Sequence, residues 1–193
     1  MRCGKEDVWV KIVREVLGWA GSIGISFALV LFIGIFVFQP YKVDGHSMDP
    51  TLQDEQRIYI SKLTHTFAQE PAYGDIVVID SRVDRPRTFK DSFMEQPVIQ
   101  WIAGSAKEKT FFVKRVIGKA GDVLEFKDHQ VYRNGQVLSE PYLKETMQFV
   151  SDKKWTVPEG HVFVMGDNRN DSWDSRNIGF IPLDHVMGVK KLP

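Results

Sequence analysis

The chain has 193 residues, which is enough for one ordinary domain with a short appendage. Its 25 basic and 25 acidic residues give a formal net charge of zero, and the basic residues form no stripe or tail. This distribution argues against a nucleic-acid partner, which would be held by a clustered positive surface.

A long apolar run lies near the N-terminus. Residues 16–38 contain no charged side chain, and a helix of that length covers about 35 Å, against about 30 Å of bilayer hydrocarbon. The run predicts a transmembrane anchor over residues 16–38, preceded by a polar tail over residues 1–15 and ended by Pro40. Four basic residues precede the run and only Lys42 follows it closely, which places the N-terminus in the cytoplasm and residues 39–193 outside.

A cleavable signal peptide is the alternative interpretation of this run. Such a peptide has an apolar core of about 7–15 residues that ends in a small-x-small cleavage site. The run here is longer and continues into Phe38, Gln39 and Pro40, so an uncleaved anchor is expected. Cys3 is the only cysteine and lies on the predicted cytoplasmic side, so the external domain is expected to have no disulfide.

The remainder of the chain has the patterns of short strands. Asn134-Gly135 supplies the two positive φ angles of a type I′ hairpin turn. The chain shows no long amphipathic helix beyond the anchor, so residues 39–193 are predicted to form a mainly β domain, an antiparallel sheet or barrel-like structure. Strands are expected at 57–62, 75–80, 111–117, 123–127, 131–138, 161–165 and 185–190.

One segment, residues 82–110, fits this pattern poorly. It carries mixed charge, two prolines and an apolar patch. We expect an excursion hairpin or a mobile loop of uncertain role. The alternative is that Phe93, Val98, Ile99 and Trp101 touch the outer leaflet of the membrane, as interfacial aromatic side chains do.

Lys114 is a candidate general base. It shares one face of the predicted strand 111–117 with Phe112 and Val116, whereas Arg115 lies on the other face. If the Phe112 face is buried, desolvation lowers the pKa of Lys114, and a shift of two or more units makes it a usable base. If the Arg115 face is buried instead, Lys114 is a solvated lysine without a catalytic role.

Ser47 is a candidate nucleophile in the string GHSMDPTL, residues 45–52. Gly45 permits unusual backbone dihedrals, and Pro50 stiffens the chain after the serine. A serine in a rigid turn with free N–H groups can supply both a nucleophile and an oxyanion donor. A second polar segment, GDNRNDSWDSR at 166–176, is either solvated or hydrogen-bonded into a site.

Four segments together resemble the conserved boxes of bacterial type I signal peptidases, membrane-anchored serine proteases with a Ser-Lys dyad. Their order and spacing agree with the family, as does the anchor just before the first box. The resemblance covers nearly the whole chain after residue 15. The segments are GHSMDPTL (45–52), YGDIVV (73–78), KRVIGKAGD (114–122) and GDNRNDSWDSR (166–176).

The resemblance implies roles for individual residues. Ser47 matches the nucleophile, Lys114 the general base, and Ser172 the serine that orients the lysine amine. Asp174 and Arg176 match a supporting ion pair near the site.

We also expect specific roles for three further positions. Asp167 is expected to be structural, and Met48 is expected to line the substrate pocket. Some family members have a serine two positions before the nucleophile that helps to hold the oxyanion, whereas this chain has Gly45 there. The backbone N–H of Ser47 is therefore expected to provide more of the oxyanion stabilisation.

The implied function is that of a membrane-bound serine endopeptidase that removes signal peptides from exported preproteins at the outer face of the cytoplasmic membrane. Its expected partners are preproteins with small-x-small cleavage sites and the lipid bilayer, with no cofactor, no metal and no nucleic acid. The oligomeric state is not indicated. Two alternatives remain: a Ser-His-Asp hydrolase that uses His161 or His185, and a non-catalytic membrane-anchored β module.

Overall fold

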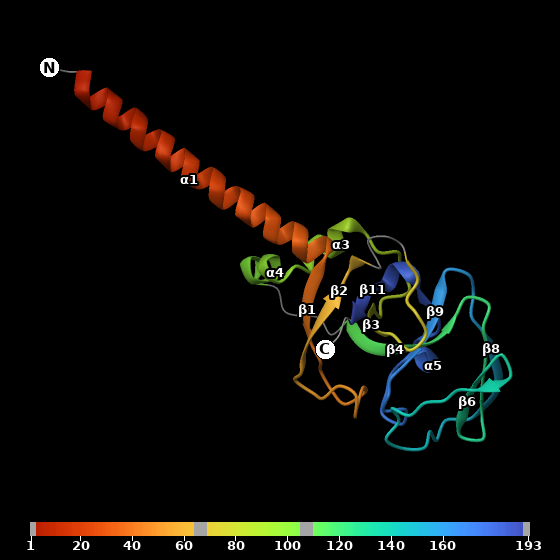
Figure 1. The fold of residues 1–193 in the computed structure, drawn as a ribbon. Helices are drawn as coiled ribbons and strands as arrows, with labels where there is room; N and C mark the ends of the chain where they lie inside the picture. The colour runs from red at the N-terminus through yellow and green to blue at the C-terminus, as the bar shows by residue number, and fades with distance from the viewer. Residues whose placement is uncertain (1–2, 64–68, 105–109, 191–193) are drawn as a thin grey trace.

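The structure is a computed structural model that describes residues 3–63, 69–104 and 110–190. The side chains of residues 3–7, 97, 98 and 103 fall outside this description, and with them the expectations for Cys3 and for membrane contact by Val98. One long N-terminal helix projects away from a β domain (Figure 1).

The N-terminal helix α1 runs without interruption from Cys3 to Phe36. The predicted tail is therefore helical from Cys3 onwards, and the helix ends before the predicted boundary at residue 38. The prediction that Pro40 ends the helix is wrong, because Pro40 lies inside strand β1 (Phe38–Lys42) and pairs with Tyr59. A proline is tolerated there because β1 is an edge strand of its sheet.

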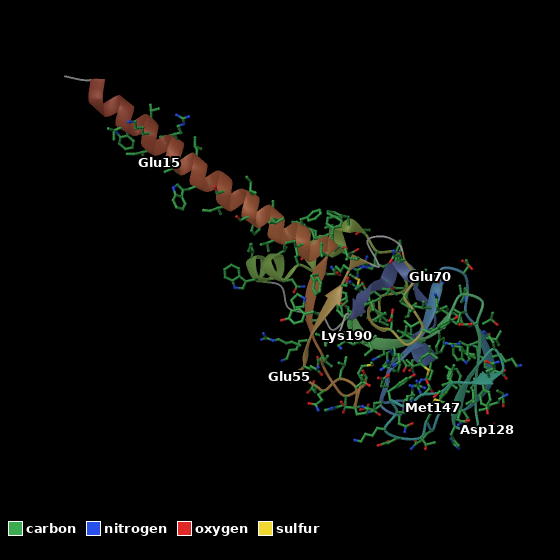
Figure 2. All side chains as sticks on the ribbon, in the orientation of Figure 1. Glu15, Glu55, Glu70, Asp128, Met147 and Lys190 are labelled. Atoms are coloured by element: carbon green, nitrogen blue, oxygen red, sulfur yellow. The ribbon has the colours of Figure 1, made fainter. Side chains whose placement is uncertain are left out.

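The surface of α1 is apolar and exposed. Within Val8–Phe36 an 18-residue window has a mean hydropathy of 2.2, and none of that window is buried against the rest of the chain. Figure 2 shows Glu15 on the projecting part of the helix and Asp128 at the opposite end of the molecule. A continuous apolar surface of this size requires a non-aqueous environment or a partner.

The larger sheet has seven strands in the order β1-β2-β11-β3-β4-β9-β10, and neighbouring strands are antiparallel. The predicted strands of this sheet are confirmed, whereas β1 and the two-residue β10 were not expected. The strands that follow β1 are β2 (Arg57–Ser61), β11 (Val186–Lys190), β3 (Ile76–Asp80), β4 (Phe111–Lys119), β9 (His161–Met165) and β10 (Ile181–Pro182).

The smaller sheet has four strands in the order β7-β6-β5-β8, again antiparallel. They are β7 (Gln136–Val137), β6 (Gln130–Arg133), β5 (Val123–Lys127) and β8 (Ser151–Thr156). The predicted hairpin is confirmed, with φ angles of 55° at Asn134 and 79° at Gly135. Strand β8 was not predicted because most of its side chains are polar and solvent-exposed.

Aliphatic and aromatic side chains from both sheets form the core of the domain. Val77 and Ile79 of β3 pack with Val116 of β4 in one buried cluster. Phe126 of the smaller sheet and Phe163 of the larger sheet pack in another, with ring centroids 5.8 Å apart. This second cluster contains residues of both sheets, so burial of its apolar surface holds the two sheets together.

The segment 82–110 contains two short helices, so the prediction of a hairpin or loop is wrong. They are α3 (Phe89–Met94) and α4 (Pro97–Ala103), and both lie near the C-terminal end of α1 in Figure 1. Thr88 begins α3 with a reciprocal capping box to Asp91. Helices this short lack the periodicity that sequence patterns detect.

Ion pairs join the end of α3 to the sheet. Arg82 bridges Asp80 of β3 and Glu95, with N–O distances of 2.7 Å to each carboxylate. Arg87 pairs with the same two carboxylates. In addition, the Gln96 side-chain amide donates to the carbonyl of Gly34 at 3.3 Å, which joins this segment to α1.

Candidate active site

Ser47 and Lys114 are in direct contact, although 67 positions separate them in the chain. Ser47 lies in the turn between β1 and β2, and Lys114 lies on β4 inside the larger sheet. The Lys114 amine donates a hydrogen bond to the Ser47 hydroxyl, with an Nζ–Oγ distance of 2.7 Å. The same contact would allow a neutral amine to accept the hydroxyl proton.

The side chain of Lys114 is buried. Lys114 pairs with Val77 of β3, is 2% exposed, and its Nζ lies 5.5 Å from the ring centroid of Phe112. The face of the strand that carries Phe112 and Lys114 is therefore buried, and Val113 and Ile117 of the other face also pack in apolar clusters. Burial lowers the pKa of Lys114 to about 8, and the negative charge of Asp174 partly opposes this shift.

The turn around Ser47 is fixed by the residues on both sides of the serine. Gly45 has a φ of +92°, and its N–H donates to the Asp54 carboxylate at 2.8 Å. Met48 is fully buried in a cluster with Leu52 and Ile58. The position of Met48 in the core gives no support to the predicted contact between its side chain and a substrate.

The loop after β9 holds the serine turn from the other side. Asn168 donates twice, from its backbone N–H to the Ser47 carbonyl at 3.0 Å and from its side-chain amide to the His46 carbonyl at 3.2 Å. Gly166 packs so closely against this turn that a Cβ at this position would overlap with the Ser47 carbonyl and the Ser172 hydroxyl. A glycine is therefore required for this approach.

The N–H of Ser47 is available to an incoming group. The preceding carbonyl, that of His46, accepts from Asp49 N–H at 3.1 Å and from Asn168. Because N–H and C=O point in opposite directions across a trans peptide bond, Ser47 N–H points away from these donors. Among the residues that the structure describes, Ser47 N–H has no acceptor, whereas the N–H of Gly45 is already used by Asp54.

The predicted ion pair between Asp174 and Arg176 is present. The Arg176 guanidinium donates to both Asp174 oxygens at 2.8 Å, and Asp174 also accepts from the N–H of Gly166 at 3.0 Å. Asp174 is fully buried and begins the short helix α5 (Ser175–Ile178) as its N-cap. The pair thus fixes the shape of the loop that contacts the serine turn.

Ser172 has a buried hydroxyl without a hydrogen-bond partner in the described part of the chain. It lies beside Gly166. No hydrogen bond between Ser172 and Lys114 is present, so the orientation of the amine by Ser172 stays a prediction. A buried hydroxyl without a partner is uncommon, because desolvation without a compensating hydrogen bond is costly.

The side chain of Arg115 connects three of the four segments noted in the sequence. Arg115 donates to both oxygens of Asp167, at 2.8 and 2.6 Å, and to the carbonyl of Gly74 at 2.8 Å. Arg115 follows Lys114 and points to the opposite face of β4. Its part in the site was not predicted, and neither was that of Asn168, because neither contact leaves a pattern in the sequence.

The two histidines of the alternative mechanism do not reach Ser47. The Nδ1 atom of His161 lies 2.8 Å from the carbonyl oxygen of Glu159. His185 is buried, and its two ring nitrogens face the carbonyls of Asp80 and Arg85 at 3.3 and 3.0 Å. The structure therefore gives no support to a Ser-His-Asp arrangement.

Comparison with known families gives one match over most of the chain. A family model described as "Signal peptidase, peptidase S26" matches residues 16–193. The matched range includes the second half of α1 and the whole β domain.

Several curated bacterial proteins are similar to this chain. Signal peptidase I of Bacillus licheniformis is 38% identical over 92% of this chain and 88% of the relative. Signal peptidase I T of Bacillus subtilis strain 168 is 35% identical over 94% and 86%, respectively. Signal peptidase IB of Staphylococcus aureus is 30% identical over 91% and 87%. A crystal structure of a signal peptidase I from Enterococcus faecalis V583 has a TM-score of 0.43 and 29% identity, over 63% of this chain and 97% of that one.

The burial of Lys114 predicts that its replacement stabilises the fold. At pH 7 the amine is charged in both the folded and the unfolded state, so Lys114→Met removes the cost of burying that charge. We expect the free energy of unfolding to rise by about 3 kcal/mol, because burial lowers the pKa of the amine from 10.5 to about 8. This gain in stability should shrink as the pH rises from about 8 to about 10.4. The folded state loses the Lys114 proton near pH 8, and the unfolded state loses it near pH 10.4.

Chemical denaturation of the full chain in detergent at pH 7 and pH 10.5 measures this difference. Lys127→Met, on a partly exposed lysine of β5, is the matched control and should change stability little. A Lys114→Met protein that is less stable than the parent at pH 7 would contradict the charge-burial argument.

Proposed function

The chain belongs to the signal peptidase family, peptidase S26, and from this premise we propose that it cleaves its substrates with Ser47 as nucleophile and Lys114 as general base. The family membership makes the protein a serine peptidase that removes signal peptides from preproteins. The observation that carries the assignment of the two residues is the 2.7 Å contact between the buried Lys114 amine and the Ser47 hydroxyl.

In the first half of the reaction, neutral Lys114 accepts the hydroxyl proton of Ser47. The Ser47 oxygen then attacks the carbonyl carbon of the scissile bond, and the carbonyl oxygen becomes an oxyanion. The free N–H of Ser47 is the donor that this geometry offers to the oxyanion. Lys114 returns its proton to the departing amine, and an ester between Ser47 and the signal peptide remains.

In the second half, Lys114 is neutral again and accepts a proton from water. The resulting hydroxide attacks the ester carbonyl, the bond to the Ser47 oxygen breaks, and that oxygen takes back a proton from Lys114. A pKa of about 8 suits this role, because a sizeable fraction of the amine is neutral near physiological pH while the ammonium form is still a good acid.

The neighbouring polar residues position this pair. The ion pair of Asp174 with Arg176 shapes the loop beside the serine turn, and Ser172 places a buried hydroxyl in the same loop. We assign Ser172 the role of holding the neutral amine of Lys114 during turnover. Gly45 has its N–H engaged by Asp54, so its contribution is to the shape of the turn.

We also propose that α1 anchors the enzyme in the cytoplasmic membrane. Its exposed apolar surface within Val8–Phe36 supports this, and the basic residues before residue 16 favour a cytoplasmic N-terminus. Residues 39–193 then form the extracytoplasmic catalytic domain. Its substrates are exported preproteins with small residues at the first and third positions before the cut.

A Ser-His-Asp hydrolase is not supported, because the ring nitrogens of His185 face carbonyl oxygens and His161 contacts its own turn. A non-catalytic β module does not agree with the family. We therefore propose the Ser-Lys mechanism.

Replacement of either residue of the dyad tests the mechanism. Ser47→Ala should abolish processing of a model preprotein in detergent, because the nucleophile is lost. Lys114→Arg should lower kcat by roughly 10²- to 10⁴-fold, because arginine keeps the positive charge but does not act as a base near neutral pH. Mass spectrometry of the cleavage products measures both effects.

Lys119→Arg is the matched control, since it makes the same change at the end of the same strand, and it should leave kcat within about twofold. Near-normal turnover by a folded Lys114→Arg protein would exclude Lys114 as the base.

The pH dependence of the reaction reports the pKa of the base. Because the neutral amine is the active form, kcat/KM should rise with increasing pH through a midpoint near 8 and then level off. Initial rates on a peptide substrate from pH 6 to pH 10 measure this curve. A midpoint near 6.5 would instead indicate a histidine base.

Gly166→Ala should impair catalysis although it leaves both side chains of the dyad in place. The added methyl group would overlap with the Ser47 carbonyl and the Ser172 hydroxyl, so the serine turn must shift. We expect a loss of about 10²-fold in kcat, the cost of a displacement of about 1 Å at a reacting group.

The control for this variant is Gly24→Ala in α1, where no atom lies near the added group and activity should not change. Full activity of Gly166→Ala would show that the two segments need not approach so closely.

A further inference from the structure

A cavity lies where the end of α1 meets the β domain. Its volume is about 320 Å³, within the range of small-molecule sites. Ile35 and Phe36 from the last turn of α1, Phe89 from α3 and Met187 from β11 form its apolar walls. This cavity is separate from the serine turn and has no part in the mechanism above.

Lys62 supplies a buried positive charge to this cavity. It follows β2, is 3% exposed, and its backbone N–H donates to the Val37 carbonyl at 2.9 Å, directly after α1. Its amine forms no hydrogen bond or ion pair with the residues that the structure describes. Burial lowers the pKa of Lys62 to about 8, with partial opposition from the charge of Glu95.

An ammonium group buried without a partner is costly. The penalty for removing such an ion from water amounts to several kcal/mol, and a hydrogen-bonded anion offsets it. Lys62 is charged below a pH of about 8, so the group exists mainly as the ammonium at neutral pH. The arrangement therefore calls for an anion in the cavity.

The other charged groups around the cavity do not replace that anion. Arg87 also lines the cavity, but its guanidinium pairs with Asp80 and Glu95. Asp184 also lines the cavity. Thr88 and Ser92 contribute hydroxyl groups that can donate to it.

The position of the cavity at the end of α1 identifies the kind of anion. The apolar span of α1 ends at Phe36, so in a membrane the cavity lies where the hydrocarbon meets the headgroups. Phosphate groups of phospholipids lie at that depth. Phe89 is 64% exposed beside the cavity and would face the upper part of the acyl chains.

We propose that this cavity binds the phosphate group of an anionic phospholipid, with Lys62 as its ion-pair partner and the acyl chains alongside α1. The inference rests on the proposed anchoring of α1 in the membrane. A lipid held there would link the β domain to the bilayer surface at a fixed point, in addition to the covalent link through Val37.

Binding of a short-chain anionic lipid to the purified full chain tests the proposal. Dihexanoyl phosphatidylglycerol is titrated into the protein in neutral detergent, and native mass spectrometry counts the lipids that remain bound. We expect saturable binding of one lipid per chain. Lys62→Gln should weaken it at least tenfold, because the anion loses its charged partner.

Two further variants keep the test decisive. Lys42→Gln removes the same charge from an exposed lysine of β1 that pairs with Glu55, and it should bind lipid as the parent does. Lys62→Met removes the buried charge altogether, so it should fold at least as well as the parent and also lose the lipid. Equal binding by parent and Lys62→Met would overturn the proposal.

Other outcomes are equally informative. No binding to the parent, or an equal loss in Lys42→Gln, would contradict a specific site. Inorganic phosphate that competes at the same concentration as the lipid would show a free-anion site and overturn the lipid assignment. Cleavage of a soluble peptide by Lys62→Gln should stay within about twofold of the parent, so failure of this proposal and failure of the Ser47–Lys114 mechanism remain distinguishable.

Discussion

The desolvation of one amine is the constraint on which the site depends. Lys114 lies on an interior strand of the larger sheet, with β3 on one side and β9 on the other, so water is largely excluded from it. That exclusion lowers its pKa to about 8, and the same exclusion weakens the folded state while the amine is charged. The extensive apolar core of the two sheets offsets this cost and keeps the amine beside Ser47.

The serine is positioned by contacts that converge from three parts of the chain. The buried side chain of Met48 fixes the turn that contains the serine. In the loop after β9, Asn168 donates hydrogen bonds to the carbonyls of His46 and Ser47. Arg115 joins that loop to β4 through Asp167. Since these contacts use carbonyl groups and leave the Ser47 N–H free, the same interactions that fix the serine also leave it the backbone donor that the proposed mechanism requires.

Two buried lysines in the described part of the chain have a pKa that is lowered to about 8, and their surroundings differ. Lys114 has a serine hydroxyl at 2.7 Å, whereas Lys62 adjoins a cavity and has no partner among the described residues. Burial alone therefore does not define a catalytic lysine. The group that the amine faces decides its chemistry: a hydroxyl that can lose a proton in one case, and a space that an anion can enter in the other.

The sequence by itself determined the elements whose signal is local. Alternating apolar residues specified most strands, Asn134-Gly135 specified a hairpin, and the long uncharged run specified an exposed apolar helix. The resemblance of four segments selected Ser47 and Lys114 as candidates. The alternation along the strand could not decide whether Lys114 is buried, because both faces of β4 carry apolar side chains. Tertiary packing decided that question. It also placed Met48 in the core, Pro40 in an edge strand and two short helices against α1. These placements depend on contacts with residues distant in the chain, which local sequence patterns do not report.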